Sequence, residues 1–466
     1  MADEVDPAHT AGQNEASAAA PAGNGAAHTV PRGAAKTTAD RAAGASSTAG
    51  AADEDAANGG HGERHASWME LFFDLVAVAG IGQLTHLLHR GPSLGDFGLY
   101  VVLYLAFWMV WACITLYGNI ARDHTRVWLM MAAMLGLGLM VAAVAGLPDR
   151  HATTFAAVYV IVRMGSAQVW GRGRVVVDWP TAQLSIGVTP WIISLWVSEP
   201  GKYWWWAAGL IIDLWAMFAV SGEKMFATIR REYDRRMRKL AAAPGFDGGR
   251  MPKLVALHAD PAHLGERLGL YVIIVLGEGV ITVVDEVGGV KWNVTVLSLG
   301  FAAFVILAGL WALTLLYGFI PRLTTTPDLD VPWQHVMLAH CVTTGALATI
   351  TAGLGLTIDH ASNHLTTGIG WALCGGAAAY FASVALSGAR SGVGLRGILA
   401  WPIPCALLSI LLGAFAAHLT ALPLICAIAV LVVWSLLWET WKAGKWRTGS
   451  GPARPRRRRR SAPAAT

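Results

Sequence analysis

The chain has 466 residues, of which 55% are hydrophobic and only 14% are charged, with a formal net charge of +5. This balance excludes an ordinary soluble globular protein, and apolar runs of about 20 residues recur at the length that crosses a hydrocarbon core about 30 Å thick. The 21 tryptophans also indicate a membrane protein, because indole rings favour the lipid–water interface.

The first segment, residues 1–64, differs from the rest of the chain. It is rich in alanine and glycine, has no aromatic residue, and carries nine acidic and four basic side chains. Because so few apolar side chains cannot form a core, we expect this segment to be a disordered cytoplasmic tail. It also lacks the basic start and short apolar run of a signal peptide.

Twelve apolar segments follow, and each predicts a membrane-spanning helix. In chain order they are 68–89, 96–118, 127–147, 152–170, 181–198, 203–222, 264–284, 293–319, 333–357, 366–387, 395–416 and 420–438. The sequence therefore predicts an all-α polytopic membrane protein. We expect two sets of six helices, over 65–222 and 264–441, with a basic cytoplasmic connector over 223–263 and a basic cytoplasmic tail over 442–466.

The charges of the loops predict the orientation. With the N-terminus in the cytoplasm, the outward loops hold four Lys or Arg residues and the inward loops hold sixteen. This asymmetry is typical of membrane proteins, whose cytoplasmic loops keep the positive charge. Both termini are therefore predicted to be cytoplasmic, and the RPRRRRR run is expected to lie near anionic lipid and not to bind nucleic acid.

An internal repeat is visible between WACITLYGNIAR (Trp111–Arg122) and WALTLLYGFIPR (Trp311–Arg322). Seven of the twelve positions agree at a constant offset of 200. Two repeats with an even number of spans share one orientation, which predicts a twofold axis along the membrane normal, as in some secondary transporters. The alternative is that apolar helices resemble one another by composition alone.

Two further motifs carry a resemblance to a known family. ELFFDLV (Glu70–Val76) opens the first span and ERLGLYVIIVLGE (Glu266–Glu278) opens the second half. Both resemble the bacterial low temperature requirement A family over most of the chain. The resemblance implies a multispanning protein of the bacterial plasma (inner) membrane that is linked to growth in the cold, without an established activity or substrate. The chain departs from the family pattern at Ala77, where an aromatic residue is expected, and at Gly279, where a serine is expected. The signature positions are Glu70, Asp74, Glu266, Arg267, Gly277 and Glu278.

Charged residues inside the spans are the candidate site. The cations are Arg163 and Arg267, and the acids are Glu70, Asp74, Asp213, Glu266 and Glu278. A charge at mid-helix costs about 2.5–3.5 kcal/mol on insertion scales, so such residues usually pair or line a polar cavity.

Depth then suggests which charges pair. Asp74 and Arg163 lie about 9 and 10 Å from the cytoplasmic ends of their predicted helices. We therefore predict an Asp74–Arg163 ion pair with Glu70 as a second acceptor. Glu266 and Arg267 open their span near the cytoplasmic surface, whereas Glu278 lies about three turns deeper, without a basic neighbour in sequence.

Two interpretations of these charges stay open. In the first, Glu278, Asp74, Arg163 and Asp213 face a shared polar cleft that binds a solute or relays a proton. In the second, they are structural pairs that fix helix packing. An unpaired acid such as Glu278 favours the first interpretation, whereas the predicted Asp74–Arg163 pair favours the second.

Other motifs predict no cofactor or metal. The five cysteines lie in apolar runs without paired spacing. GVGLRG (Gly392–Gly397) lies in a short loop without the strand that a nucleotide-binding motif needs. His360 and His364 offer too few ligands for zinc, and His335 and His340 are expected to be hydrogen-bonded packing residues.

The sequence therefore favours a secondary-transporter-like protein whose partners are membrane lipids and an unknown small solute or proton. The alternative is a non-transporting membrane protein that senses or supports membrane state during growth in the cold. We expect no enzyme activity, because no Ser/His/Asp or Cys/His grouping is present.

Overall fold

The structure is a computed structural model that describes residues 66–88, 92–121, 125–147, 150–168, 175–177, 185–219, 227, 230–232, 234–235, 238, 255–257, 260–318, 333–361 and 364–447. Contacts divide the chain into Met1–Gly62 and Glu63–Thr466, and every described residue belongs to the second unit. The predicted tail over 1–64, most of the connector over 223–263 and the end of the basic tail lie outside the described residues.

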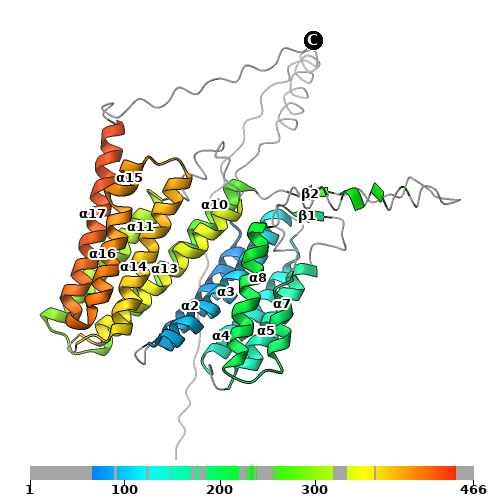
Figure 1. Cartoon of the computed structure of the whole chain (residues 1–466), viewed down its shortest axis with the longest axis horizontal. Coiled ribbons are helices and arrows are strands. Elements are labelled where there is room, and N and C mark those ends of the chain that lie inside the picture. Colours follow the sequence, from blue (N-terminus) through cyan, green and yellow to red (C-terminus); the bar gives the residue numbers. More distant parts are fainter. Residues whose placement is uncertain are drawn as a thin grey trace, which may run out of the picture. The chain divides into compact units, whose positions relative to one another are not determined.

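In the described residues, six helices form an N-terminal helix group (Figure 1). They are α2 (Trp68–Leu88), α3 (Leu94–Ala121), α4 (Val127–Val144), α5 (Ala152–Gln168), α7 (Val188–Ser194) and α8 (Gly201–Ala219). α2 packs against α3 and α4, α5 packs against α4 and α7, and α8 contacts both α7 and α3.

The remaining helices form a C-terminal helix group. They are α10 (Pro261–Gly289), α11 (Val294–Leu315), α13 (Trp333–Asp359), α14 (Thr367–Arg390), α15 (Leu395–Ala400), α16 (Pro402–Phe415), the 3₁₀ turn η3 (Ala416–His418) and α17 (Ala421–Arg447). α14 packs between α13 and α16, and α11 packs against α17. The predicted span 395–416 is interrupted at Trp401, because Pro402 lacks the N–H that a continuous helix would use.

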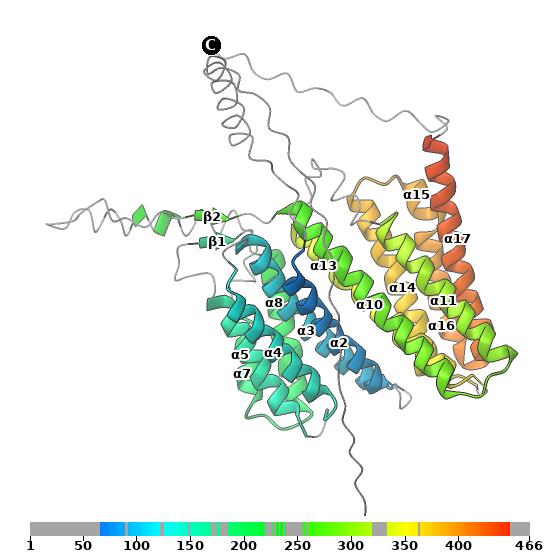
Figure 2. The same ribbon diagram turned by 180° about the vertical axis from the view of Figure 1, so that it is seen from behind.

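The two helix groups meet where α10 packs against α2 and α3, and where α13 also contacts α2 and α3 (Figures 1 and 2). Trp108 and Trp111 of α3 and Tyr271 of α10 are fully buried there. The Tyr104 hydroxyl is 2.8 Å from the Cys341 carbonyl oxygen, which ties α3 to α13. A buried, hydrogen-bonded interface therefore joins residues that lie 237 positions apart in the sequence.

Side-chain caps fix where several helices begin. The Asp260 carboxylate accepts hydrogen bonds from the backbone N–H groups of Ala262 and His263, and Pro261 occupies the first turn of α10. The Asn293 side chain caps α11 in the same manner through the N–H of Val296, at 2.9 Å. Helix α10 therefore begins at Pro261, three residues before the predicted start at residue 264.

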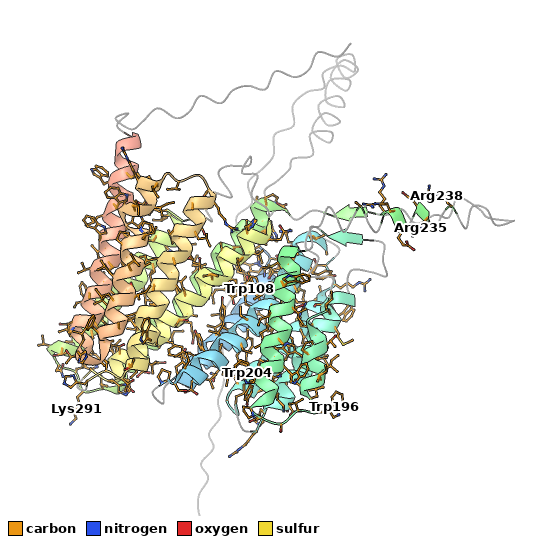
Figure 3. All side chains as sticks on the ribbon, in the orientation of Figure 1. Trp108, Trp196, Trp204, Arg235, Arg238 and Lys291 are labelled. Carbon is orange, nitrogen blue, oxygen red and sulfur yellow. The ribbon has the colours of Figure 1, made fainter. Side chains whose placement is uncertain are left out.

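Nine helical segments within the described residues are long and apolar enough to cross a membrane. Every predicted span contains helix, but α5 provides only a shorter apolar helix, α7 has seven residues, and α8 is also not among the nine. The multi-pass helical architecture is therefore confirmed, without the full count of twelve. Trp196 and Trp204, where α7 and α8 are joined, are 80% and 77% exposed. Figure 3 shows them, together with Lys291, toward the lower edge of the view.

One short pair of strands was not predicted. β1 (Val175–Val177) pairs in parallel with β2 (Val255–Leu257). Both strands consist of apolar residues within segments that the sequence assigns to basic loops. Valine favours extended backbone where it can pair, and three residues are too few for a periodicity to reveal a strand.

Candidate functional site

Glu70 is held at the first turn of α2 by a capping box. The Ser67 hydroxyl and backbone N–H both donate to Glu70 Oε2 at 2.9 Å, and the Glu70 N–H donates back to the Ser67 hydroxyl at 3.3 Å. This reciprocal arrangement is what a Ser-x-x-Glu sequence at a helix start favours. The cap and the positive end of the helix dipole therefore stabilise a carboxylate at this buried position.

Asp74, one turn further along α2, binds Arg267 of α10. The Arg267 Nε donates to Asp74 Oδ2 at 3.0 Å, and its Nη2 donates to Oδ1. The indole N–H of Trp111 donates to the same Oδ1 at 2.7 Å. Arg267 also reaches Glu70, with Nη1 3.1 Å from Oε1. One guanidinium thus faces two carboxylates, and the bonds cross from one helix group to the other.

His263 completes this arrangement. Its Nε2 lies 3.4 Å from Glu70 Oε2, and its Nδ1 lies 3.0 Å from Asn119 Nδ2. Because Asn119 Oδ1 accepts the backbone N–H of Asp260 at 2.7 Å, the amide must present its NH₂ to the histidine. Nδ1 is then an acceptor, and the neutral histidine carries its proton on Nε2, facing Glu70. We call Glu70, Asp74, His263 and Arg267 the Asp74 cluster.

The Asp74 cluster is almost completely shielded from solvent. Glu70 is 2% exposed and Asp74, His263 and Arg267 are each 0% exposed. Asp74 and Arg267 each lie six residues from the start of their helix, which places both about 9 Å from the same end. Their helices run side by side in the same direction, so level residues on facing sides meet.

A second buried pair lies within the N-terminal helix group. Arg163 Nη2 donates to Asp213 Oδ2 at 3.0 Å, and Nη1 donates to Cys113 Sγ at 3.0 Å. The backbone N–H of Gly187 donates to Asp213 Oδ1 at 3.1 Å. A Cβ on Gly187 would overlap this carboxylate, so the close approach of α7 to α8 requires glycine. Helices α3, α5, α7 and α8 therefore converge on the Arg163–Asp213 pair.

The predicted Asp74–Arg163 pair is wrong. Arg163 binds Asp213, and the partner of Asp74 is Arg267. Depth fixes only the position of a residue along the membrane normal, and two residues at one depth can still face different neighbours. The Asp260 cap extends α10 by three residues beyond the predicted start, so Arg267 lies deeper in its helix than the sequence predicts.

Glu266 and Glu278 lie outside the Asp74 cluster and the Arg163–Asp213 pair. Glu266 is half-buried and precedes Arg267, so it projects from a different side of α10. Glu278 is half-buried near the middle of α10, and a Cβ on Gly82 of α2 would overlap its carboxylate. Within the described residues, no hydrogen bond or ion pair reaches the Glu278 carboxylate. The structure thus separates the seven predicted residues into the Asp74 cluster, the Arg163–Asp213 pair and two other positions.

Aromatic side chains that the sequence did not assign to the candidate site lie next to the Asp74 cluster, beginning with Trp111, which donates to Asp74. Trp111 stacks on His340 with centroids 5.2 Å apart and lies 4.2 Å from the Tyr271 ring. His340 accepts a hydrogen bond at Nδ1 from the Trp108 indole at 3.4 Å and donates from Nε2 to the Leu268 carbonyl at 3.2 Å. Both ring nitrogens are thus used, which agrees with the expectation that His340 is a hydrogen-bonded packing residue.

Two hollows accompany these clusters. The interface groove, about 480 Å³, lies between α3 of one group and α13 and α14 of the other, and Tyr100, Tyr104 and Trp371 are among its lining residues. The C-terminal cavity, about 80 Å³, lies inside the C-terminal helix group, with His340, Tyr380, Trp401 and Glu439 in its wall. None of the seven predicted site residues lines either hollow. In the described part of the chain, no group of three or more His, Cys, Asp or Glu residues could hold a metal.

Comparison with known proteins identifies relatives without an assigned activity. The family model of the bacterial low temperature requirement A protein (LtrA) matches residues 65–436. An uncharacterized protein of Rhizobium meliloti (strain 1021), RA0937, is 29% identical over 233 residues, which is 47% of this chain and 50% of that protein. The chain thus spans about half the length of this curated relative, and no solved structure matches.

Proposed function

The chain belongs to the bacterial low temperature requirement A family, and from this premise we propose that it is a membrane transport protein whose two helix groups move against each other. In this proposal the twelve predicted segments form two six-helix repeats, related by a twofold axis along the normal of the bacterial inner membrane, with both termini cytoplasmic. In support, α3 and α11 begin at Leu94 and Val294, at the same offset of 200 as the repeated motif. Transporters with parallel repeats carry their solute between the halves.

The observation that carries the proposal is the position of the Asp74 cluster. Its charges lie where the two helix groups meet, and Arg267 bridges them. A buried ion pair often stabilises a protein no more than apolar packing of the same volume, because both ions lose their hydration. Leucine side chains would stabilise a permanently closed interface as much as these charges do. An interface that opens benefits from charged groups, because water can solvate them in the open state.

The cluster and the groove occupy different depths. The Asp74 cluster lies at the starts of α2 and α10, the ends predicted to be cytoplasmic, whereas the groove includes Leu94 and Phe97 at the opposite end of α3. This arrangement corresponds to a transporter that is closed on the cytoplasmic side. The Asp74 cluster is the contact that closes it, and movement of the helix groups breaks the Asp74–Arg267 bonds.

Glu278 is the proposed coupling residue. It lies three residues from the middle of α10, about 4.5 Å along the axis. It faces Gly82 of α2, so its carboxylate lies at the same interface as the Asp74 cluster, but deeper in the predicted span. A carboxylate at this depth without a counter-ion is costly unless it takes up a proton or a cation. Proton or cation exchange at Glu278 therefore couples to movement between α2 and α10.

Distance measurements between spin labels test the movement. Because Cys426 is the exposed native cysteine in the described part of the chain, a Cys426→Ser background leaves the engineered positions as the accessible thiols. One labelled pair is Val127→Cys with Leu395→Cys, at the predicted cytoplasmic end. The other is Leu94→Cys with Val294→Cys, at the opposite end. All four positions are highly exposed.

Alternating access predicts two distance populations for each pair in nanodiscs, with opposite changes at the two ends. Asp74→Asn weakens the closing contact and shifts the protein toward longer cytoplasmic and shorter opposite distances. Asp359→Asn, which neutralises an exposed carboxylate at the end of α13, is the control and leaves both distributions unchanged. One narrow distance at each end, identical in all three proteins, would refute the movement.

Proton flux into proteoliposomes, recorded with an entrapped pH dye during a screen of solutes, tests the coupling residue. We expect Glu278→Gln to abolish solute-dependent flux and Gly82→Ala to impair it, because the added methyl displaces the Glu278 carboxylate. Asp359→Asn should retain the flux. A solute-dependent flux that survives Glu278→Gln would remove Glu278 from the mechanism.

A non-transporting protein that supports membrane state in the cold is the second candidate. It is favoured by the complete pairing of Asp74 with Arg267 and of Arg163 with Asp213, since such pairs can serve packing alone. In that case the label distances stay fixed, no solute drives flux, and loss of the ion pairs affects folding and growth in the cold only.

A further inference from the structure

The C-terminal cavity is independent of the charged clusters and has a chemistry of its own. It lies at the end of the C-terminal helix group that contains the α14–α15 turn and the second half of α17. Its volume of about 80 Å³ is several times the roughly 10–15 Å³ that a single water occupies on the same measure. The wall surface is mainly apolar, and aliphatic side chains from α10, α11, α13 and α14 contribute to it, so the cavity favours an apolar body over a water cluster.

One carboxylate lies in the wall, together with neutral polar side chains such as Thr343, Ser387 and Ser391. Glu439 of α17 lines the cavity, and its side chain is only 13% exposed. The indole N–H of Trp401 donates to Glu439 Oε1 at 3.1 Å, which fixes the position of the carboxylate. The cation nearest to it is Lys442, whose Nζ lies 3.6 Å from Oε2 and whose side chain is 37% exposed. This long, exposed contact is a weak ion pair.

Aromatic rings also line the cavity that Glu439 borders. Tyr317, Tyr380 and Trp401 all contribute to the cavity wall. The Tyr380 hydroxyl is already paired with Thr314 at 2.8 Å, so this ring offers mainly its apolar surface. Aromatic rings beside a shielded carboxylate are a favourable environment for an organic ammonium group, because the rings and the anion both attract the cation.

We propose that the C-terminal cavity binds a small amphipathic organic cation. The apolar body of this ligand lies against the aliphatic wall, and its ammonium group lies beside Glu439, among Tyr317, Tyr380 and Trp401. Lys442 leaves the carboxylate and extends into solvent when the ligand binds, so the charge of Glu439 stays compensated in both states. The site does not depend on the proposed transport function, because binding requires neither movement of the helix groups nor Glu278.

Equilibrium binding of radiolabelled benzyltrimethylammonium to the purified full chain in phosphatidylglycerol nanodiscs tests the proposal. This probe is permanently charged, and neopentylbenzene is its neutral isostere. We expect saturable binding of the cation that the neutral isostere does not displace. Glu439→Gln should weaken binding by about tenfold or more. Lys442→Gln should strengthen it by about threefold, because the competing cation is removed.

Three controls keep the result decisive. Glu232→Gln neutralises an exposed carboxylate of the connector and should leave the affinity unchanged. Glu439→Gln should weaken binding and Lys442→Gln should strengthen it. Because misfolding would weaken binding in both variants, these opposite effects distinguish loss of the site from loss of the fold. Adding phosphatidylethanolamine to the nanodiscs should not compete with the probe, and competition would assign the site to a lipid headgroup. Equal binding to wild type and Glu439→Gln, or displacement by neopentylbenzene, would overturn the proposal.

Discussion

Replacing Arg267 with methionine, which keeps a long side chain and removes the guanidinium, gives the sharpest test of the Asp74 cluster. The substitution leaves Asp74 and Glu70 in a site that is at most 2% exposed, without the cation that faces them. Removing one partner of a buried pair costs about 3–5 kcal/mol, because the remaining charge is left without compensation. Asp74→Asn should cost less, about 1–3 kcal/mol, because Arg267 still binds Glu70.

The double variant Asp74→Asn with Arg267→Met should lose less free energy of unfolding than the two single variants lose together. We predict a coupling energy of about 2 kcal/mol between Asp74 and Arg267, which lies in the range for residues that share a buried network. In a double-mutant cycle of Asp74→Asn with Arg163→Met, the losses of the two single variants should add within about 0.5 kcal/mol, because the guanidinium of Arg163 is bound to Asp213 and not to Asp74.

Unfolding by sodium dodecyl sulfate in mixed micelles, followed by tryptophan fluorescence, gives the free energies for both cycles. Lys291→Met, at an exposed loop position, is the matched control and should change the free energy of unfolding by no more than about 0.5 kcal/mol. A coupling below 0.5 kcal/mol for Asp74 with Arg267, or a larger coupling for Asp74 with Arg163, would refute the assignment.

The other predictions concern single side chains and use the same unfolding measurement. Ser67→Ala removes the cap of α2 and should lower the free energy of unfolding by about 1 kcal/mol, and an unchanged value would show that the capping box contributes nothing. Gly187→Ala forces a methyl group onto Asp213 and should cost about 1–3 kcal/mol, whereas Gly138→Ala, which has open space around it, should be neutral or stabilising. Trp111→Phe keeps an aromatic ring but removes a hydrogen bond to a buried carboxylate, so we expect a loss of about 1.5–3 kcal/mol, and a neutral result would contradict the hydrogen bond from Trp111 to Asp74.

The positions of the helices could be predicted from the sequence because lipid imposes a length of about 20 apolar residues on a span. The segments at 68–89, 127–147 and 333–357 all contain helices with closely matching bounds. The segment 181–198 differs, because within its described residues 185–198 the α-helix covers Val188–Ser194 alone, with Gly187 at its N-cap. The parallel pair of β1 and β2 could not be foreseen, since strand pairing depends on where the loops meet.

The charged residues were identified correctly, but their partners were not. The sequence shows that a lone guanidinium in a span needs an acid, and Arg163 and Arg267 both have one. Which acid it is depends on how the helices are rotated and which of them are neighbours, and neither is visible in one sequence. The Asp260–Pro261 pair was the missed signal, since an aspartate cap followed by proline marks the start of α10.

The central claim is that Arg267 of α10 pairs with Asp74 and Glu70 of α2, whereas Arg163 pairs with Asp213 inside the N-terminal helix group. A cryo-electron microscopy map of the full chain in lipid nanodiscs, resolved to side chains, tests this claim most directly. The account predicts continuous density from Arg267 to both Asp74 and Glu70, with Arg163 turned toward Asp213. A map with Arg267 directed at lipid headgroups, or with Arg163 against Asp74, would contradict it.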